Sequence, residues 1–497
     1  MRLRNTARQA RRYWPALKRI GPRCFLALLT GCRGAATPYA SDPGSFTSTR
    51  SAVLTRQVMA DSAMEVANRP LATTWHFFHE TAEHLTALTT GEFGKRVMLP
   101  FYGTPYPLPT TNETLDLARF DAELQQITGE SVQPTNLQLQ VSGDESLDAL
   151  EKLIGQATSH IDVIMFQWES DKLGQAIAAR LAAVAGPNLK VRILIDGGGN
   201  MFFSEPEDAD AVAVNRVIHN LAQHPYIEVV RIRNPFARYD HRKLVIIDGR
   251  LAWTGGRNFC SCAFFEHHDL SFVLTGPLVG QMQQRFETYW EEQGGQTSAP
   301  PSPTVTRAQI NEITIAAVAP APANSQARLL DSEPGNRQLA SAIYEAVDRA
   351  RHHIYVENVY LTDSRLVVKL AEARRRGVDV RVVMTVESTS PTINQSNRVV
   401  ANRLLQAGIR VYLYPGMTHV KAVAVDGVWA YLGTGNLDPL SLRHNHELGF
   451  SITGRQVIVD LEQRLFLPDM RPEREMHEPL HMSFQDWLSE WAASICL

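Results

Sequence analysis

DHRKLVIIDGRLAWTGGRN, at residues 240–258, returns in changed form at residues 418–436 as THVKAVAVDGVWAYLGTGN. Each copy has an apolar, β-branched run, an Asp-Gly pair, a second apolar run and a glycine-rich turn. Asp-Gly between two such runs is a strong signal for a β-hairpin. The sequence therefore predicts the same hairpin twice, in a chain made of two similar lobes.

Five positions recur at the same spacing in the two copies. Counted from the histidine, a Lys, an Asp, an Asn and an acid lie at offsets +2, +7, +17 and +28 in both copies. The first set is His241, Lys243, Asp248, Asn258 and Asp269, and the second is His419, Lys421, Asp426, Asn436 and Glu447. Only eight of the 49 Lys and Arg residues are Lys, yet Lys occupies the same motif position twice. This usage indicates a need for a compact ammonium group rather than a guanidinium fork.

The spacing gives the residues different roles. A His and a Lys two residues apart on a strand face the same side. Asp248 and Asp426 stand at the predicted hairpin turns, so we interpret them as turn-shaping residues rather than catalytic ones.

This pattern resembles the phospholipase D superfamily, whose mark is a paired His/Lys/Asp motif followed by Gly-x-x-Asn. The resemblance covers roughly residues 136–470 and is nearest to bacterial cardiolipin synthases and phospholipase D-like proteins. It implies an α/β fold with two pseudo-symmetric α/β/α lobes that form one active site at their interface. It also implies a covalent phosphohistidine and a phospholipid substrate. Among the histidines, the resemblance favours His241 as the nucleophile.

The residue types suit phosphoryl transfer without a metal or cofactor. Lysine charge and asparagine amides can stabilise the non-bridging oxygens. One imidazole must start neutral to attack, and the other must carry a proton for the leaving alcohol. The acids at offset +28, Asp269 and Glu447, are expected to bind Nδ1–H of the histidine in their own copy. No spacing of His, Cys and acids indicates a metal site, including the His- and Glu-containing stretch at residues 75–84. His267, His268, His444 and His446 flank the two acids, either at the entrance to the site or as solvated loop residues.

Strands and helices alternate in the same order in both lobes, which predicts βαβ units and a largely parallel sheet. In lobe 1 we expect helices at 147–157, 173–185 and near 210–222, and strands at 161–168, 191–195 and 227–232. In lobe 2 we expect helices at 338–350, 364–376 and 397–407, and strands at 354–360, 380–386 and 409–414. The resulting division is a signal peptide at 1–31, a tether and helical extension at 32–135, lobe 1 at 136–298, a linker at 299–325, lobe 2 at 326–470 and a C-terminal tail at 471–497.

The N-terminus resembles a bacterial lipoprotein signal. Residues 1–41 contain basic residues and no acid, and the apolar run 24–29 is followed by Thr-Gly-Cys. This pattern predicts cleavage before Cys32, lipidation of that residue, and an enzyme anchored to the membrane and facing the periplasm. The alternative is a disordered basic tail on a cytosolic protein. Cys260 and Cys262 are too close for an easy disulfide, so we interpret them as two small, semi-buried residues.

The C-terminal tail, residues 483–497, is predicted to be a helix with a capping box and one apolar face. That face either packs on the body of the protein or lies on a membrane.

Composition restricts the class of partner. Net charge is −3, with 20% charged and 44% hydrophobic residues, and no domain is strongly basic, so no nucleic-acid partner is expected. We therefore expect a phospholipid phosphodiesterase or phosphatidyltransferase, either a phospholipase D or a cardiolipin synthase-like enzyme, acting at a membrane surface. The alternatives are a nuclease-type phosphodiesterase and an inactive scaffold of the cell envelope.

Overall fold

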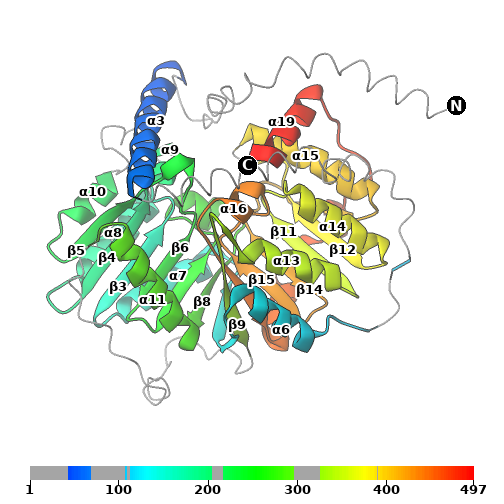
Figure 1. Cartoon of the computed structure of the whole chain (residues 1–497), viewed down its shortest axis with the longest axis horizontal. Helices are drawn as coiled ribbons and strands as arrows, with labels where there is room; N and C mark the ends of the chain where they lie inside the picture. Colours follow the sequence, from blue (N-terminus) through cyan, green and yellow to red (C-terminus); the bar gives the residue numbers. More distant parts are fainter. Residues whose placement is uncertain are drawn as a thin grey trace.

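The structure is a computed structural model, which describes residues 43–68, 107–108, 112–203, 216–295, 325–388 and 390–496. Two sheets lie side by side with helices around them, one sheet in each lobe (Figure 1). This arrangement confirms the two predicted lobes.

The sheet of lobe 1 has seven strands in the order β2-β8-β7-β6-β3-β4-β5. Its strands are β2 (Asn136–Gln140), β3 (His160–Met165), β4 (Lys190–Asp196), β5 (Ile227–Ile232), β6 (Lys243–Ile247), β7 (Leu251–Gly255) and β8 (Ser271–Thr275). Its helices are α7 (Gly143–Gly155), α8 (Lys172–Val184), α9 (Gly197–Phe203), α10 (Arg216–Ala222) and α11 (Pro277–Glu292), with short turns η4 (Pro235–Ala237) and η5 (Cys262–Glu266).

The sheet of lobe 2 has nine strands in the order β1-β9-β16-β15-β14-β11-β12-β13, with β10 paired to β9. Its strands are β1 (Gln133–Pro134), β9 (Gln326–Glu333), β10 (Asn336–Arg337), β11 (His353–Asn358), β12 (Asp379–Met384), β13 (Arg410–Leu413), β14 (Lys421–Val425), β15 (Trp429–Gly433) and β16 (Glu447–Thr453). Its helices are α13 (Gln338–Arg349), α14 (Ser364–Arg375), α15 (Pro391–Gln406), α16 (Pro439–Arg443), α17 (Arg455–Leu461), η6 (Glu462–Phe466), α18 (Leu467–Asp469), η7 (Pro472–Arg474) and α19 (Phe484–Cys496).

The prediction of a largely parallel sheet was wrong. In lobe 1 only the β3–β4 and β4–β5 pairs are parallel, whereas β3–β6, β6–β7, β7–β8 and β2–β8 are antiparallel. The reason is the motif hairpin of β6 and β7. Strand β6 pairs with β3 in the antiparallel direction, and β8 and β2 continue the antiparallel pairing beyond β7. A hairpin can only propagate antiparallel pairing, while crossover helices propagate parallel pairing.

The core has three parts, because alternate strand residues face opposite sides of each sheet. Helices α7, α8 and α10 cover the outer face of the lobe 1 sheet, and α13 and α14 cover that of lobe 2. The inner faces share a third core, in which Phe272 meets Phe450 edge to face at 5.3 Å between ring centroids. Residues from both lobes therefore meet across one desolvated interface.

Segments outside the repeat brace the lobes. Helix α3 (Pro43–Asn68) reaches lobe 1, where Asp61 accepts hydrogen bonds from Arg231 and from the backbone N–H of Asn234. Helix α6 (Leu117–Thr128) lies on lobe 2, with Phe120 packed edge to face against Trp429. Residues 32–42, 69–106 and 109–111 of the predicted extension, which include the stretch 75–84, lie outside the described residues.

The C-terminal helix α19 forms as predicted, with Ser483 and Asp486 exchanging the capping-box hydrogen bonds. It packs on α15, but through ion pairs of Asp486 with Arg398 and of Glu490 with Arg403. On its apolar face Phe484 and Leu488 are 78% and 46% exposed, while the Trp487 ring lies 5.0 Å from the Arg403 guanidinium of α15. The helix therefore packs on the body through its acidic side and part of its apolar face.

Candidate functional site

Each motif histidine is hydrogen-bonded to the acid of the opposite lobe. His241 Nδ1 lies 3.1 Å from Glu447 Oε2, and His419 Nδ1 lies 2.7 Å from Asp269 Oδ2. We expected each acid to bind the histidine of its own copy, and that expectation was wrong. The crossed pairing joins the two motif copies into one site at the lobe interface.

The crossing follows from the backbone. The backbone N–H of His241 donates to the carbonyl of His446 at 2.9 Å, and that of His419 donates to the carbonyl of His268 at 2.6 Å. The segment before each motif strand thus runs beside the segment that carries the other lobe's acid. The equal spacing in the two copies shows that the motif is repeated, but it does not determine which lobe's acid lies nearer to each histidine.

The two motif lysines are buried in the same site. Lys243 and Lys421 are 0% and 2% exposed, and each Nζ donates to the carbonyl of the histidine two residues earlier at 2.5 Å. Burial lowers the pKa of Lys243 to about 7 and that of Lys421 to about 8. The carboxylates of Asp269 and Glu447 oppose this effect at both lysines. Since each lysine feels the acids of both lobes, the four groups share one electrostatic environment.

Burial disfavours the charged form of both histidine rings. Burial lowers the pKa of His419 to about 3, and Lys421 lowers it further while Asp269 opposes. Burial also lowers the pKa of His241, with Glu447 opposing. Because a carboxylate engages Nδ1 of each ring, Nε2 is left as the nitrogen with an available lone pair.

The two asparagines complete a polar lining. Asn258 Nδ2 donates to Gln167 Oε1 at 3.2 Å, and the carbonyl oxygens of Asn258 and Asn436 are buried with no hydrogen-bond donor within the described part of the chain. An unsatisfied buried polar atom is unfavourable unless something else pairs with it. Both asparagines therefore retain hydrogen-bonding capacity inside the site.

Sequence reasoning missed two polar side chains here. Gln167 follows β3 and meets Asn258, and Thr434 donates to Glu447 Oε2 at 2.6 Å. Thr434 stands in the glycine-rich turn of the second copy, where the first copy has Gly256. A Cβ on Gly256 would lie 2.1 Å from Asp269 Oδ1, so the acid occupies the space that this glycine leaves open.

Asp248 and Asp426 shape the turns, as the sequence predicts. Both have positive φ, at 53° and 55°. Asp426 also accepts hydrogen bonds from the backbone N–H groups of Leu115, Arg351, His352 and His353, at 2.8–2.9 Å. Asp248 does the same for Thr158, Ser159 and His160, and these donors outweigh burial and hold its pKa well below the usual range. Each aspartate thus anchors the loop that leads into the central strand of its lobe.

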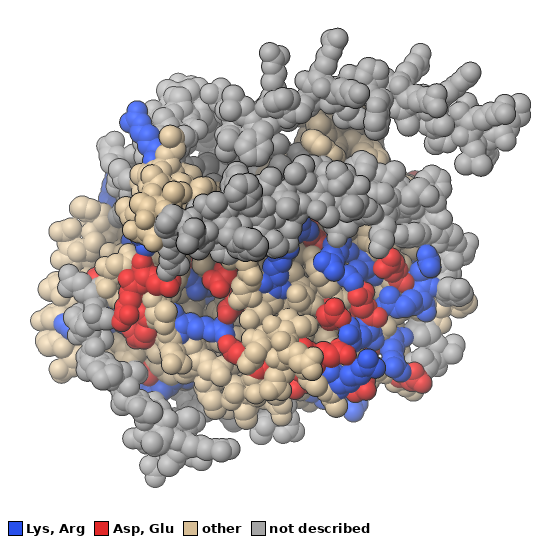
Figure 2. Space-filling view, viewed as in Figure 1, with Lys and Arg blue, Asp and Glu red and all other residues tan. Residues whose placement is uncertain are grey.

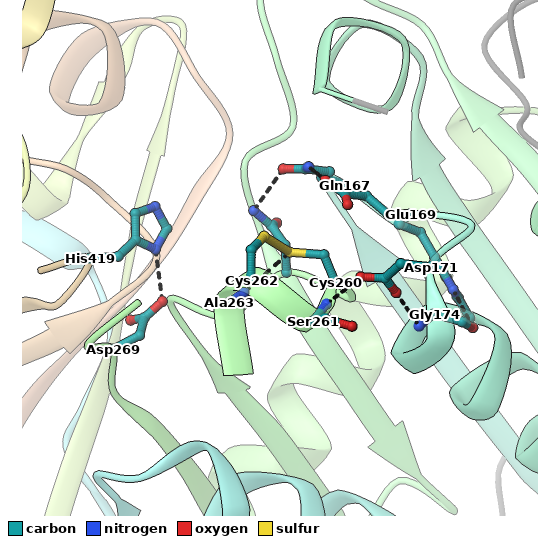
Figure 3. Close-up of a disulfide and its surroundings, with 12 residues drawn as sticks. Gln167, Glu169, Asp171, Gly174, Cys260, Ser261, Cys262, Ala263, Asp269 and His419 are labelled. Atoms are coloured by element: carbon teal, nitrogen blue, oxygen red, sulfur yellow. Dashed lines mark hydrogen bonds and ion pairs between the residues drawn. A yellow bond between two sulfur atoms is a disulfide. The ribbon is translucent and has the colours of Figure 1, made fainter. Parts of the chain in front are cut away.

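Cys260 and Cys262 form a disulfide, contrary to our interpretation (Figure 3). Their Cα atoms are 5.3 Å apart, which is within the range that a disulfide spans, because the loop bends sharply after Asn258. The backbone N–H of Ser261 donates to Asp171, and this bond holds the bend. In Figure 3 the disulfide lies between Gln167 and the His419–Asp269 pair.

Comparison with known proteins indicates the family to which a chain with this geometry belongs. A family model described as "Cardiolipin synthase, PLD-like domain" matches residues 150–290 and 343–466, more than half of the chain. Both motif copies fall within the matched segments. The chain belongs to this phospholipase D-like family. As a member of the phospholipase D superfamily, it is a phosphodiesterase or transferase.

Individual relatives and structures agree. Cardiolipin synthase A of Yersinia pseudotuberculosis serotype O:1b (strain IP 31758) is 28% identical over 353 residues, which cover 67% of this chain and 68% of that protein. Cardiolipin synthase A of Yersinia pestis gives the same values. Among solved structures, phosphatidylserine synthase of Haemophilus influenzae Rd KW20 has a TM-score of 0.57 at 16% identity, covering 76% of this chain and all of that chain. This likeness confirms the phospholipase D fold.

The surface adds two observations. Lys and Arg are interspersed with Asp and Glu on the face shown in Figure 2, and do not form a stripe of one sign there. Within the described segments, no helix combines the length and apolar character needed to cross a bilayer. The predicted lipidation residue, Cys32, lies outside the described residues.

Proposed function

We propose that this phospholipase D-superfamily enzyme transfers a phosphatidyl group between alcohols or to water through a covalent phosphohistidine. The catalytic residues are His241, Lys243, Asn258, Asp269, His419, Lys421, Asn436 and Glu447. The observation that carries the proposal is the crossed pairing, which gives one site two buried imidazoles, each with a carboxylate on Nδ1.

In the first step, Nε2 of one histidine attacks phosphorus and a P–N bond forms. The P–O bond to the leaving alcohol breaks, and that oxygen takes a proton from Nε2 of the other histidine, which is protonated when the anionic substrate binds. Lys243 and Lys421 stabilise the non-bridging oxygens during this step. In the second step, water or an alcohol gives its proton to the second histidine and attacks phosphorus, so the P–N bond breaks and both rings return to their starting state.

The two rings are not equivalent as nucleophiles. Sequence resemblance favours His241, whereas the electrostatics favours His419, because its pKa is lowered to about 3 and the ring stays neutral over the wider pH range. Acid quenching during turnover, followed by peptide mass spectrometry, identifies the phosphorylated ring directly. Phosphate on the peptide containing residue 419 would support the electrostatic argument, and phosphate on that containing residue 241 would refute it.

The substrate class is supported by the relatives. Cardiolipin synthases A of two Yersinia species match 67% of the chain. With phosphatidylglycerol as acceptor the product would be cardiolipin, and with water it would be phosphatidic acid. We propose a phospholipid donor in both cases.

We also propose that the enzyme acts at the membrane surface as a periplasm-facing lipoprotein anchored through Cys32. The outward apolar face of α19 supports contact with lipid, since Phe484, Trp487 and Leu488 are 78%, 47% and 46% exposed. Membrane fractionation of the Cys32→Ala variant tests the anchor. Full recovery of that variant with the membranes would exclude lipidation as the means of attachment.

The test of activity uses vesicles of phosphatidylglycerol and phosphatidylethanolamine with lipid products read by mass spectrometry. His241→Ala and His419→Ala should abolish the product, while His219→Ala, an exposed histidine on α10, should leave it unchanged. Cardiolipin as the main product would identify a synthase, and phosphatidic acid a phospholipase D. Absence of both products, with hydrolysis of a nucleic-acid phosphodiester instead, would contradict the proposed substrate.

A further inference from the structure

A second polar cluster lies beside the catalytic histidines and bridges the two lobes. It consists of His268 from lobe 1, which directly precedes Asp269, together with Glu357 of β11 and Asp469 of α18. One nitrogen or oxygen atom from each of the three side chains lies within 4.8 Å of the other two. The catalytic chemistry proposed above assigns no task to any of them.

Glu357 is the unusual member. It is 0% exposed, and its Oε2 has no hydrogen-bond partner among the described residues. At the equivalent position of the lobe 1 sheet stands Ile164, since Ile164 pairs with Leu244 and Glu357 with Ala422, one residue beyond the motif lysines. A carboxylate replaces an aliphatic side chain at this buried position, and a buried carboxylate is unfavourable unless a cation or a proton neutralises it.

The polar atoms of the three side chains lie close together, and one carboxylate oxygen among them has no hydrogen-bond partner in the described part of the chain. His268 Nε2 lies 2.8 Å from Asp469 Oδ2 and 3.6 Å from Glu357 Oε1. Arg474 binds the other oxygen of Asp469, Oδ1, at 2.9 Å and therefore leaves Oδ2 turned to the imidazole. Thr418 donates to Glu357 Oε1 at 2.6 Å, so Oε2 is the oxygen without a donor.

The 3.6 Å separation of the imidazole and Glu357 is that of two ligands of one ion, whereas the 2.8 Å separation of the imidazole and Asp469 is that of a hydrogen bond, which an ion would replace. Ligand atoms about 2.0–2.2 Å from a zinc ion stand roughly 3.3–3.6 Å from one another at tetrahedral angles. One imidazole nitrogen with two carboxylates suits zinc, whereas magnesium and calcium prefer oxygen alone. The His268 side chain is 17% exposed, which gives an ion a path from solvent.

We propose that His268, Glu357 and Asp469 bind one Zn²⁺ ion as a clasp between the lobes. The ion would fasten lobe 1 at His268 to lobe 2 at β11 and α18. The backbone of the same segment holds the catalytic pair, because the His268 carbonyl accepts the N–H of His419 and Thr418 is bonded to Glu357. The clasp therefore fixes the position of His419 without touching the substrate.

Binding is measured on the full chain after treatment with a chelator. Cys260→Ser/Cys262→Ser serves as the parent, because Glu169 and these two sulfurs form another group of possible ligands. Equilibrium dialysis with metal quantification should find about one Zn²⁺ per chain. Glu357→Gln and Asp469→Asn, which keep the side-chain shape, should each weaken binding by at least about tenfold. They should also abolish the rise in the unfolding temperature that zinc produces in the parent.

His446→Gln is the matched control. His446 Nδ1 lies 3.6 Å from a carboxylate oxygen of Glu333, and among the described residues His446 belongs to no group of three possible ligands. This variant should bind zinc as the parent does. If a variant fails to fold, the site is tested in the parent instead. Co²⁺ added to the parent should give visible absorption bands, and Zn²⁺ should remove them. No bound zinc in the parent, equal affinity in Glu357→Gln, or no cobalt bands would overturn the proposal.

Discussion

Replacing Glu447 by Gln tests whether the acid of lobe 2 serves the histidine of lobe 1. Glu447 is 1% exposed and lies 3.0–3.1 Å from His241 Nδ1 through its two oxygens. The amide has the same shape and can keep the hydrogen bonds to Nδ1–H and to Thr434. The substitution therefore removes the negative charge while it preserves the packing.

The expected effect is large because the charge acts at hydrogen-bond distance in a buried place. At about 3 Å and an effective dielectric constant of about 20, a unit charge pair is worth roughly 5 kcal/mol, which is an upper bound. A neighbouring charge changes a pKa by about 1–3 units in practice. Without the carboxylate, the pKa of His241 should fall further by that amount, since Glu447 is the group that raises it against burial. An imidazolium that is harder to form should lower kcat by about 10²–10⁴.

The assay combines NMR and kinetics. Ring ¹⁵N signals report each histidine separately, and Glu447→Gln should shift those of His241 and leave those of His419 in place. Turnover of phosphatidylglycerol vesicles should show the loss in kcat with little change in KM. Glu333→Gln, a half-exposed acid outside the catalytic set, should alter neither. Shifts at His419 instead of His241 would refute the crossed pairing, and a fall in kcat below about tenfold would refute the role of the carboxylate.

Three further changes follow from the structure. Lys243→Met should raise the free energy of unfolding at pH 7 in a denaturant titration while abolishing activity. The pKa of Lys243 is about 7 in the folded state and 10.5 in the unfolded state, so between these values the unfolded state binds the extra proton. The resulting destabilisation is on the order of 4 kcal/mol at pH 7 and fades as the pH rises to 10.5. A Lys243→Met protein no more stable than the parent would contradict this. Asp426→Ala should destabilise the protein by about 3 kcal/mol or more, because four backbone donors lose their acceptor, and an unfolding midpoint within error of the parent would refute the anchoring role. Gly256→Ala should lower kcat by displacing Asp269, whereas Gly280→Ala, an exposed helical site with open space around it, should be neutral; equal rates in the two variants would show that the acid tolerates the methyl group.

Local features of the fold could be predicted from the sequence. Strand β5 spans the predicted residues 227–232, and α13 and α14 each end one residue before the predicted end. These elements could be predicted because the spacing of apolar residues along the chain depends only on local sequence. The Asp-Gly turns were recognisable for the same reason. The direction of strand pairing was not, since periodicity does not say that the motif hairpin inserts beside β3 rather than extending the parallel sheet.

Features that depend on which loops meet could not be predicted. The disulfide of Cys260 and Cys262 needs a sharp bend, and the bend depends on Asp171, about ninety residues earlier. The cluster of His268, Glu357 and Asp469 gathers residues spread over two hundred positions. In α19, the acidic side chains pair with the half-buried Arg398 and the buried Arg403 on α15, so partners distant in the sequence decide which side of the helix packs.

The crossed acids have a consequence for how the two lobes depend on each other. Each lobe carries a histidine and an acid, yet neither can pair them internally, because the His241 and His419 backbones are tied to the opposite lobe's chain. A lobe alone would expose an imidazole without its orienting carboxylate and a lysine without the counter-charge that moderates its lowered pKa. Assembly of the interface therefore completes the two histidine–carboxylate pairs themselves. Changes at the interface core, such as the Phe272–Phe450 contact, should accordingly lower activity before they unfold either lobe.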